Sequence, residues 1–152
     1  IVLLKGFDPR GFVFYTNYES AKGEQLKASP HAALGFHWKS LRRQVRVRGS
    51  VTSVPEAEAD EYFASRAKAS RISAIASDQS RPLPSRDVFA ERIEALQETY
   101  ADRDDIPRPD NWGGYRVVPE SIEFWQDQAF RMHDRLKFIM KNGVWTPERL
   151  YP

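Results

Sequence analysis

The segment IEFWQDQAFRMHDRL, residues 122–136, holds the side chains of this chain that are best suited to chemistry. Trp125 is followed closely by Arg131, His133 and Arg135, which alternate with other residues. On a strand, such alternation projects all three basic groups from one face. Two guanidiniums and an imidazole on one face repel each other unless an anion or acid partner lies nearby. The pattern therefore predicts an anion site here; a surface ladder neutralised across the sheet is the alternative.

A second group of polar and cationic residues lies near the start of the chain. Lys5 ends an apolar segment, Tyr15 and Thr16 end the next one, and Lys22 falls in the first turn of a helix expected over 20–28. A cation is unfavourable at the positive end of a helix. Its presence there indicates a bound anion such as phosphate, which backbone N–H groups would also hold. A solvated lysine is the alternative interpretation.

A tyrosine and an arginine share a face of the helix expected over 56–66, because Tyr62 and Arg66 are four residues apart. Together they could hold a phosphate ester, with the guanidinium binding in a bidentate manner; an exposed helix face is the alternative. Gln44 lies on a strand face opposite valines, and its amide can donate and accept toward a planar heterocycle. Three further polar residues are weaker candidates: Ser70, Gln79 and Ser80.

Composition narrows the function classes. The chain has 152 residues, which favours one domain, and its net charge of +2 is too balanced for a dedicated nucleic-acid binder. We interpret the arginines of 42–48 as the solvent face of a strand. Cysteine is absent, so disulfides and thiolate sites are excluded, and we expect a reducing, cytoplasmic setting. No membrane span, metal site or familiar catalytic motif is expected.

Apolar periodicity and turn residues predict a β-barrel with added helices. Because IVLLK already resembles a strand, we expect no signal peptide, and we expect the domain to begin before Ile1. The Asn142-Gly143 pair predicts a hairpin turn. Strands are expected over 1–5, 11–17, 31–38 and 42–54, with closing strands over 115–119, 121–126, 131–140 and 144–150. Helices are expected over 20–28, 56–66, 71–77 and 86–101.

The sequence resembles the pyridoxine (pyridoxamine) 5′-phosphate oxidases over nearly its whole length. The EFWQ run followed by R-x-H-D-R is the most diagnostic part. The other matching segments are VLLKGFDPRGFVFYTNYESAKGEQL, HAALGFHWKSLRRQVRVRG, YFASR, SRISAIASDQSRP, WGGYRVVPESI and the terminal ERLYP.

This resemblance implies a fold that is mainly β with inserted helices, an FMN-binding split β-barrel. It implies a single domain over 1–152 that lacks the N-terminal part of the family domain, with dimerisation and substrate binding in a segment of about 110–152. It also implies a homodimer with FMN sites at the subunit interface.

The implied activity is FMN-dependent oxidation of pyridoxine or pyridoxamine 5′-phosphate, both phosphorylated B6 vitamers, to pyridoxal 5′-phosphate. O2 is the implied acceptor and H2O2 a product. Two alternatives stay open: a related flavin oxidase on another substrate of the phenazine type, and a non-catalytic module that binds FMN or pyridoxal phosphate.

Site residues follow from the same resemblance. Arg131 and His133 would be catalytic. Flavin contacts would fall on Val2, Leu3, Leu4, Lys5, Tyr15, Thr16, Lys22, Gln44, Gln79, Ser80, Trp125 and Arg135. Substrate contacts would fall on Lys5, Tyr62, Arg66, Ser70, Arg131 and His133. Many members have Arg-Lys where this chain has Ala21-Lys22, which implies the loss of one contact to the flavin phosphate.

Overall fold

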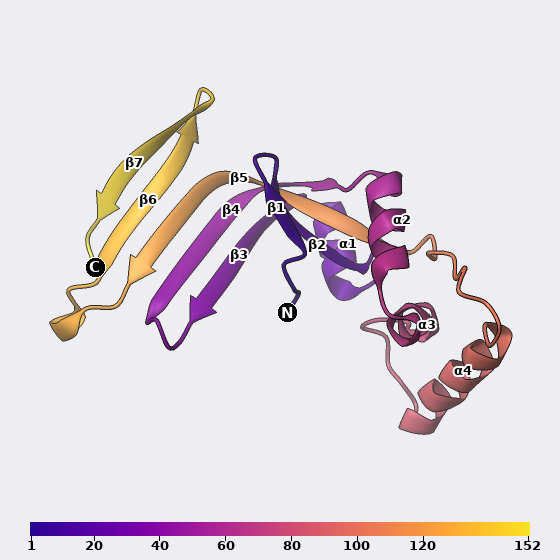
Figure 1. Ribbon diagram of the computed structural model, residues 1–152. Coiled ribbons are helices and arrows are strands. Elements are labelled where there is room, and N and C mark those ends of the chain that lie inside the picture. The colour runs from indigo at the N-terminus through magenta and orange to yellow at the C-terminus, as the bar shows by residue number, and fades with distance from the viewer.

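The computed structural model describes residues 1–152 and contains one seven-stranded sheet with four α-helices (Figure 1). The strands are β1 (Gly6–Asp8), β2 (Gly11–Asn17), β3 (His31–Trp38), β4 (Arg43–Ser53), β5 (Trp112–Gln126), β6 (Asp134–Lys141) and β7 (Val144–Leu150). The helices are α1 (Ala21–Ala28), α2 (Glu56–Ser65), α3 (Lys68–Ala76) and α4 (Arg86–Thr99), with a short 3₁₀ turn over Ala129–Arg131. None of the helices is long and apolar enough to cross a membrane.

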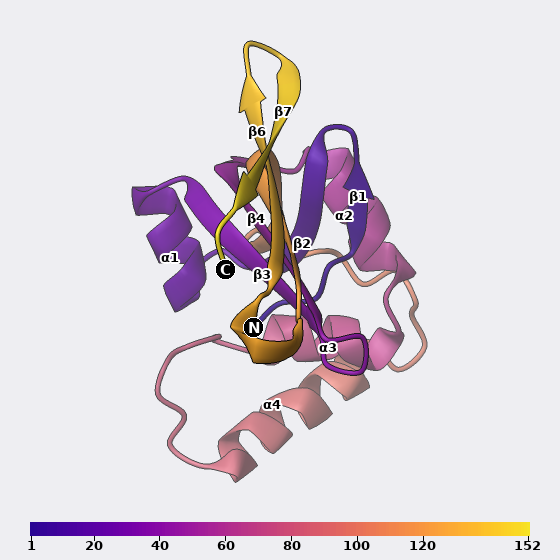
Figure 2. The same cartoon turned by 90° about the vertical axis from the view of Figure 1, so that its left-hand side faces the viewer.

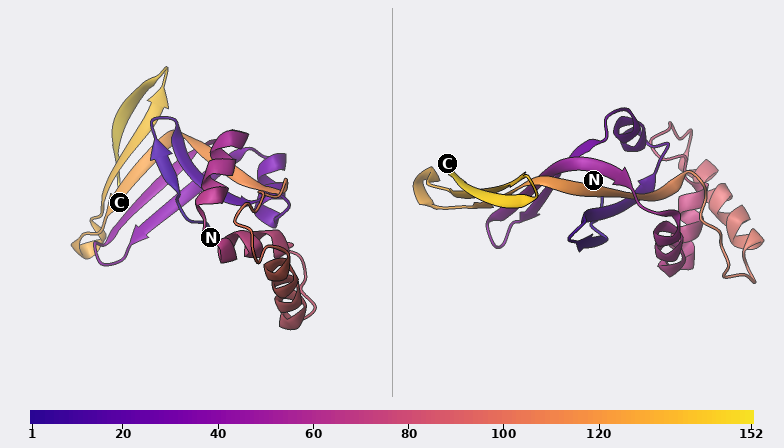
Figure 3. Two further views of the ribbon diagram at one scale, coloured as in Figure 1. Left: turned by 45° about the vertical axis from the view of Figure 1, so that its right-hand side comes forward. Right: turned by 90° about the horizontal axis from the view of Figure 1, so that it is seen from above.

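The sheet is entirely antiparallel and is organised around the 15-residue strand β5. Its order is β1-β2-β5-β4-β3, and β6 pairs with the second half of β5 and carries β7. The sheet curls into an open half-barrel, with α2, α3 and α4 near one end of β5 and the β6–β7 hairpin at the other (Figure 1, Figure 3). This arrangement confirms the expected fold class, mainly β with inserted helices.

Two hydrophobic clusters hold the elements together. One lies in the curl of the sheet and is built from Phe14, Val47, Val51 and Val117. The valines of β4 therefore face inward, as their alternation predicts. The other cluster joins α2 and α3 to the start of β5 and is built from Phe63, Ile72, Ile106 and Trp112. Figure 2 shows α1 on one side of the sheet and α2 on the other.

Most elements predicted from local patterns are present, but the first strand is not. Residues 1–5 form no strand, and β1 begins at Gly6. Only the Lys5 N–H joins the hairpin, donating to the Val13 carbonyl at 2.9 Å. Val2 instead packs against the cluster in the curl, so burial of its side chain replaces strand pairing. Helix α3 also begins earlier than predicted, at Lys68, and β5 runs without interruption from Trp112.

The predicted shared strand face of Arg131, His133 and Arg135 is wrong. Gln126 pairs with Asp134 across the β5–β6 ladder, so the chain must reverse direction between them. Arg131 lies in the 3₁₀ turn with a φ of 62°, His133 lies between this turn and the strand, and Arg135 alone belongs to β6. The alternation of side chains cannot extend through such a reversal. The other predicted turn, Asn142-Gly143, is confirmed and has positive φ at both residues.

Candidate functional site

A cavity of about 630 Å³ lies between the start of the chain, the end of β2 and the junction of α2 and α3. Ten residues predicted for the site line it: Val2, Leu3, Lys5, Tyr15, Thr16, Lys22, Tyr62, Arg66, Ser70 and Gln79. The remaining lining residues are Ile1, Ser65, Ala67 and Trp112. Three of these side chains are cationic and none is a carboxylate. An anion is therefore the ligand that the cavity would attract.

Lys22 is surrounded by neutral oxygen atoms rather than by acids. Its Nζ donates to Gln79 Oε1 at 2.7 Å, to Thr16 Oγ1 at 3.0 Å and to Ser20 Oγ at 3.1 Å. Burial lowers the pKa of the Lys22 ammonium, and no carboxylate offsets this effect. The charge of Lys22 is thus available to a ligand in the cavity.

The local sequence fixes Lys22 at this point. Ser20 caps α1, since its Oγ accepts from the Gly23 N–H at 3.3 Å and donates to the Asn17 carbonyl at 2.7 Å. A Cβ on Gly23 would lie 2.1 Å from the Tyr18 carbonyl oxygen, so only glycine allows this close approach. The cap therefore sets the first turn of α1 directly after β2, and Lys22 turns toward Thr16.

Arg66 lies on the opposite side of the cavity, just after α2 ends. Its guanidinium lies 4.8 Å from the ring centroid of Trp112 and 5.6 Å from that of Phe63. Burial lowers the pKa of Arg66, although a guanidinium keeps its charge at any ordinary pH. Its Nη1 is buried without a hydrogen-bond partner. An unpaired buried donor of this kind indicates a ligand that accepts hydrogen bonds.

Stacked aromatic rings form one wall of the cavity. The rings of Tyr15 and Tyr62 are 3.9 Å apart, and Tyr15 stacks on Trp112 at 5.5 Å. Lys5 Nζ lies 5.8 Å from the Tyr62 ring. Burial, with a smaller contribution from Glu58, raises the pKa of the Tyr15 hydroxyl, so it stays protonated and can donate. Trp112 is not among the residues predicted for the site, since its place in the wall depends on how α2 packs against β5.

A second group of predicted residues lies elsewhere. Gln44 and Trp125 are register partners on β4 and β5 and line a separate, mostly apolar hollow of about 440 Å³ with Trp38 and Phe124. The ring of Trp125 packs on His133 at 4.7 Å. The tryptophan and the histidine, eight residues apart in the sequence, are therefore in contact. Neither residue lines the cavity that holds Lys22 and Arg66.

His133 has two possible partners for one ring nitrogen. Its Nδ1 accepts from the Gln128 N–H at 3.2 Å and lies 3.0 Å from Asp127 Oδ1. Because Nδ1 accepts a hydrogen bond without a hydrogen and donates one when it carries a hydrogen, the two contacts belong to different tautomers of the ring. In both states Nε2 is free to meet a ligand.

Arg135 belongs to a partly buried ion-pair network. Its Nε donates to Glu123 Oε1 at 2.8 Å, and Arg46 Nη2 contacts Glu123 Oε2 at 2.5 Å. Burial acts to raise the pKa of Glu123, but the hydrogen bonds from both arginines outweigh it, and the pKa lies below its usual value. The guanidinium of Arg135 therefore already has an acid partner within this chain.

Comparisons with known proteins decide the family. A family model described as pyridoxamine 5′-phosphate oxidase matches residues 1–100, and one described as the pyridoxine 5′-phosphate oxidase C-terminal dimerisation region matches residues 112–152. The chain belongs to the pyridoxamine 5′-phosphate oxidase family. A pyridoxine/pyridoxamine 5′-phosphate oxidase of Hyphomonas neptunium is 66% identical over all of this chain and 70% of its own length. One from Gluconobacter oxydans is 60% identical, over all of this chain and 76% of its own length.

Solved structures agree with this family fold. PhzG from Burkholderia lata 383, solved with tetrahydrophenazine-1-carboxylic acid, superposes with a TM-score of 0.92 at 27% identity, over 99% of this chain and 73% of its own. An FMN-binding protein of Nostoc punctiforme, related to pyridoxamine 5′-phosphate oxidase, superposes with a TM-score of 0.75 at 17% identity, over 99% of this chain and 78% of its own. The second likeness concerns the fold alone.

Five residues that the family resemblance assigns to the site line neither hollow: Leu4, Ser80, Arg131, His133 and Arg135. Leu4 lines an adjoining apolar hollow under β3. Ser80 is exposed and has a φ of 72°. Arg131 is exposed and makes no ion pair within the chain. Their assigned roles stay predictions.

Proposed function

We propose that this protein oxidises pyridoxine or pyridoxamine 5′-phosphate to pyridoxal 5′-phosphate with bound FMN. The observation that carries the proposal is the cavity with three cationic side chains, Lys5, Lys22 and Arg66, and no carboxylate. Both FMN and the substrate bring a phosphate dianion, which accounts for cations on separate elements. The identity of 56–66% to curated B6 oxidases over the whole chain supports the same activity.

The residues present fit both phosphorylated molecules. Lys22, with Thr16 and Gln79 beside it, offers an ammonium without an acid partner for the phosphate of FMN. The buried, unpartnered Nη1 of Arg66 offers a donor for the phosphate of the substrate. Tyr62, Ser70 and Lys5 would complete that second phosphate site, which we call the substrate-phosphate cradle: Lys5, Tyr62, Arg66 and Ser70.

Bound FMN would supply the redox chemistry, the two-electron oxidation of the substrate at C4′ with O2 as the final acceptor and H2O2 as product. With the amine substrate, water would hydrolyse the resulting imine and release ammonia. The protein contributes orientation and electrostatics. The cradle would hold the substrate by its phosphate. Arg131 and His133 would hold the pyridine ring. Arg131 would also stabilise the charge that develops on the substrate as the hydride leaves C4′.

A second copy of the chain would complete the site. Gln44, Trp125, Arg131, His133 and Arg135 do not line the cavity with the cradle. Strand β5 joins the two regions, and a 15-residue strand can extend up to about 50 Å. We propose a homodimer, formed with the 112–152 segment, in which each site combines the cavity of one protomer with the β5–β6 turn of its partner. The expected cytoplasmic location stays a prediction.

Purified protein tests the proposal directly. It should carry a yellow flavin spectrum, and pyridoxine 5′-phosphate should cause O2 uptake with formation of pyridoxal 5′-phosphate and H2O2. Bound flavin without turnover of either B6 substrate would reject the oxidase activity. Tight binding of pyridoxal 5′-phosphate without peroxide would favour a non-catalytic binding module instead.

Because the structure resembles that of PhzG, the experiment must also distinguish B6 vitamers from substrates of the phenazine type. A substrate of the phenazine type brings no phosphate and would not need the cradle. Arg66→Ala with Tyr62→Phe should therefore raise KM for a phosphorylated substrate strongly. An unchanged KM would favour the phenazine type of substrate over the B6 vitamers.

A further inference from the structure

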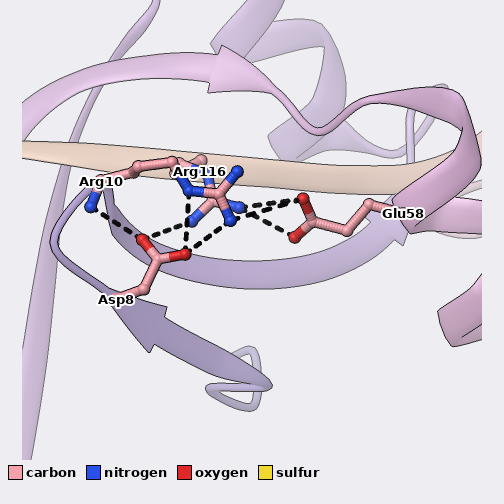
Figure 4. A network of polar contacts seen from close by, with 4 residues as sticks. All are labelled: Asp8, Arg10, Glu58 and Arg116. Carbon is pink, nitrogen blue, oxygen red and sulfur yellow. Dashed lines mark hydrogen bonds and ion pairs between the residues drawn. The ribbon is translucent and has the colours of Figure 1, made fainter.

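A nearly buried arginine of β5 joins three segments of the chain. Arg116 is 5% exposed, and its Nη2 donates to both carboxylate oxygens of Glu58, at 2.8 and 3.1 Å. Its Nη1 donates to Asp8 Oδ1 at 3.1 Å, and Arg10 binds the same Asp8 from the solvent side (Figure 4). The guanidinium thus connects β5 to helix α2 and to the β1–β2 turn.

A second arginine binds the same helix from the segment that precedes β5. The side chain of Arg108 is 9% exposed. Its Nε donates to Asp60 Oδ1 at 2.7 Å, and its Nη2 contacts Glu56. Its Nη1 donates to the Trp112 carbonyl at 2.6 Å. Arg108 therefore links α2 to the strand residue whose ring lies under Arg66.

The other contacts of helix α2 are mainly apolar and aromatic, through Phe63 and Tyr62. Its N-cap is Pro55, which makes no side-chain capping bond, and only Ala59 and Phe63 are buried among its ten residues. Apolar burial is non-directional, so it restricts the rotation and sliding of a helix less than directed polar contacts do. The hydrogen-bonded carboxylates of its first two turns restrict both movements, since bidentate arginine pairs depend on geometry.

Two residues of the substrate-phosphate cradle lie at the other end of this helix: Tyr62 in its last turns and Arg66 as its C-cap. Tyr62 follows Glu58 by one turn and lies on the same face, and Arg66 follows by a second turn. A rigid shift of α2 at Glu58 would also move Tyr62, one turn further along the helix, and would carry Arg66, which caps the helix. Tyr62 stacks on Tyr15 at 3.9 Å, which leaves little tolerance for such a shift.

We propose that Arg116 and Arg108 are positioning residues for the oxidase: by holding the acidic start of α2, they place Tyr62 and Arg66 at the substrate phosphate. The inference rests on the proposed function. It adds residues outside the cavity that determine affinity for the phosphorylated substrate and leave flavin binding by Lys22 unaffected.

Electrostatics support the proximity of this network to the cavity. Glu58 contributes to the raised pKa of Tyr15, after burial, and Arg116 acts in the opposite direction. Both charges therefore act on an aromatic residue that lines the cavity. Because Glu58 and Arg116 carry opposite charges, their effects on Tyr15 partly cancel. A variant that removes one of the two charges therefore also changes the electrostatic potential at Tyr15. The test removes the helix carboxylate, since Asp8 then still partners Arg116.

The test uses the FMN-loaded protein and the variant Glu58→Gln. Arg116 then keeps its bond to Asp8, so no buried guanidinium is left without an acid partner. We expect KM for pyridoxine 5′-phosphate to rise about ten-fold, with kcat and retained FMN within about two-fold of wild type. Glu61→Gln is the matched control, because Glu61 lies on α2, is exposed and forms no ion pair. It should leave all three quantities unchanged.

A second arm addresses the other arginine with the pair Glu56→Gln and Asp60→Asn, for which we expect the same split between KM and kcat. Arg116→Lys, which keeps the charge without the fork, should fall between wild type and Glu58→Gln. A KM for Glu58→Gln equal to that of Glu61→Gln would overturn the inference. So would an equal loss of FMN and of substrate affinity, since that result indicates general damage to the fold.

The proposed function and this inference fail in different ways. If wild-type protein binds FMN but does not oxidise either B6 substrate, the function is rejected. Calorimetry with pyridoxal 5′-phosphate then supplies the readout, and a roughly ten-fold weaker Kd for Glu58→Gln than for Glu61→Gln would still support positioning by Arg116. A wild-type protein that neither turns over nor binds this probe would overturn both.

Discussion

The rings of Tyr15 and Tyr62 stack with centroids 3.9 Å apart and an interplanar angle of 16°, although one residue belongs to β2 and the other to α2. This contact joins the two parts of the molecule that surround the cavity. It also places the Tyr62 hydroxyl in the cavity with Arg66 and Lys5. The stack therefore serves both the stability of the α2 packing and the proposed recognition of phosphate.

Substitutions at Tyr62 separate these two roles. Tyr62→Phe keeps the ring and removes only the hydroxyl, so KM for the phosphorylated substrate should rise several-fold while Tm stays unchanged. Tyr62→Leu also removes the stack and should lower the free energy of unfolding by about 1–2 kcal/mol. Steady-state kinetics and thermal unfolding measure the two effects. A Tyr62→Phe variant with normal KM would remove the hydroxyl from the proposed cradle.

Lys22 should control the affinity for FMN. Its ammonium has only neutral partners, so Lys22→Gln removes a positive charge from the cavity without leaving an unpaired acid. Loss of a charge-assisted hydrogen bond of about 1.5–3 kcal/mol corresponds to a Kd for FMN that rises about ten- to one-hundred-fold. Flavin fluorescence titration measures it. Lys27→Gln, in the exposed last turn of α1, is the control and should leave the Kd unchanged.

Glu123 should give stability that disappears in acid. Its folded pKa is depressed, so its contribution is fully present above the unfolded value of about 4.3 and is lost as pH falls through the folded value. Glu123→Gln should cost about 1–3 kcal/mol at pH 7 and progressively less below about pH 4. Urea unfolding at several pH values measures this difference. Glu148→Gln, from an exposed pair with Lys137, should change stability by less than about 1 kcal/mol.

Elements with strong local patterns could be predicted from the sequence. Ser20 before an eight-residue helix, the valines of β4 and the Asn142-Gly143 turn each act through neighbours in the chain. The first five residues show the limit of this approach. Their β-branched and leucine side chains favour a strand. A strand also needs a neighbouring strand to pair with, and the local sequence does not show whether one is available.

The site could be predicted only in part for the same reason. Arg131 and His133 lie beside a chain reversal in which Phe130 and Arg131 have positive φ. The segment contains no glycine, so the sequence pattern did not predict a turn there. The stack of Trp112 under Arg66 depends on packing between α2 and β5, which no spacing reveals. Residue type and spacing indicated most of the residues that line the cavity but left Lys22 and Arg66 with solvated alternatives, and the family resemblance assigned them to ligands.

The shared site of the proposed homodimer gives a strict test by complementation. Arg66→Ala damages the cavity of one protomer, and Arg131→Ala damages the β5–β6 turn. Each variant alone should be nearly inactive, since every site in either homodimer carries the defect. In a heterodimer of the two, one site collects both substitutions and the other collects neither, provided that each site uses both protomers.

Mixed subunits should therefore regain activity that neither parent has. Random reassortment places half of the dimers in the heterodimeric state with one intact site each, so activity should return to roughly a quarter of wild type. The two variants are co-expressed with different tags, and the heterodimer is isolated before turnover is measured. The isolated heterodimer should show about half the wild-type rate. If Arg66 and Arg131 serve the same site from the same protomer, each heterodimer keeps two singly damaged sites and no recovery occurs.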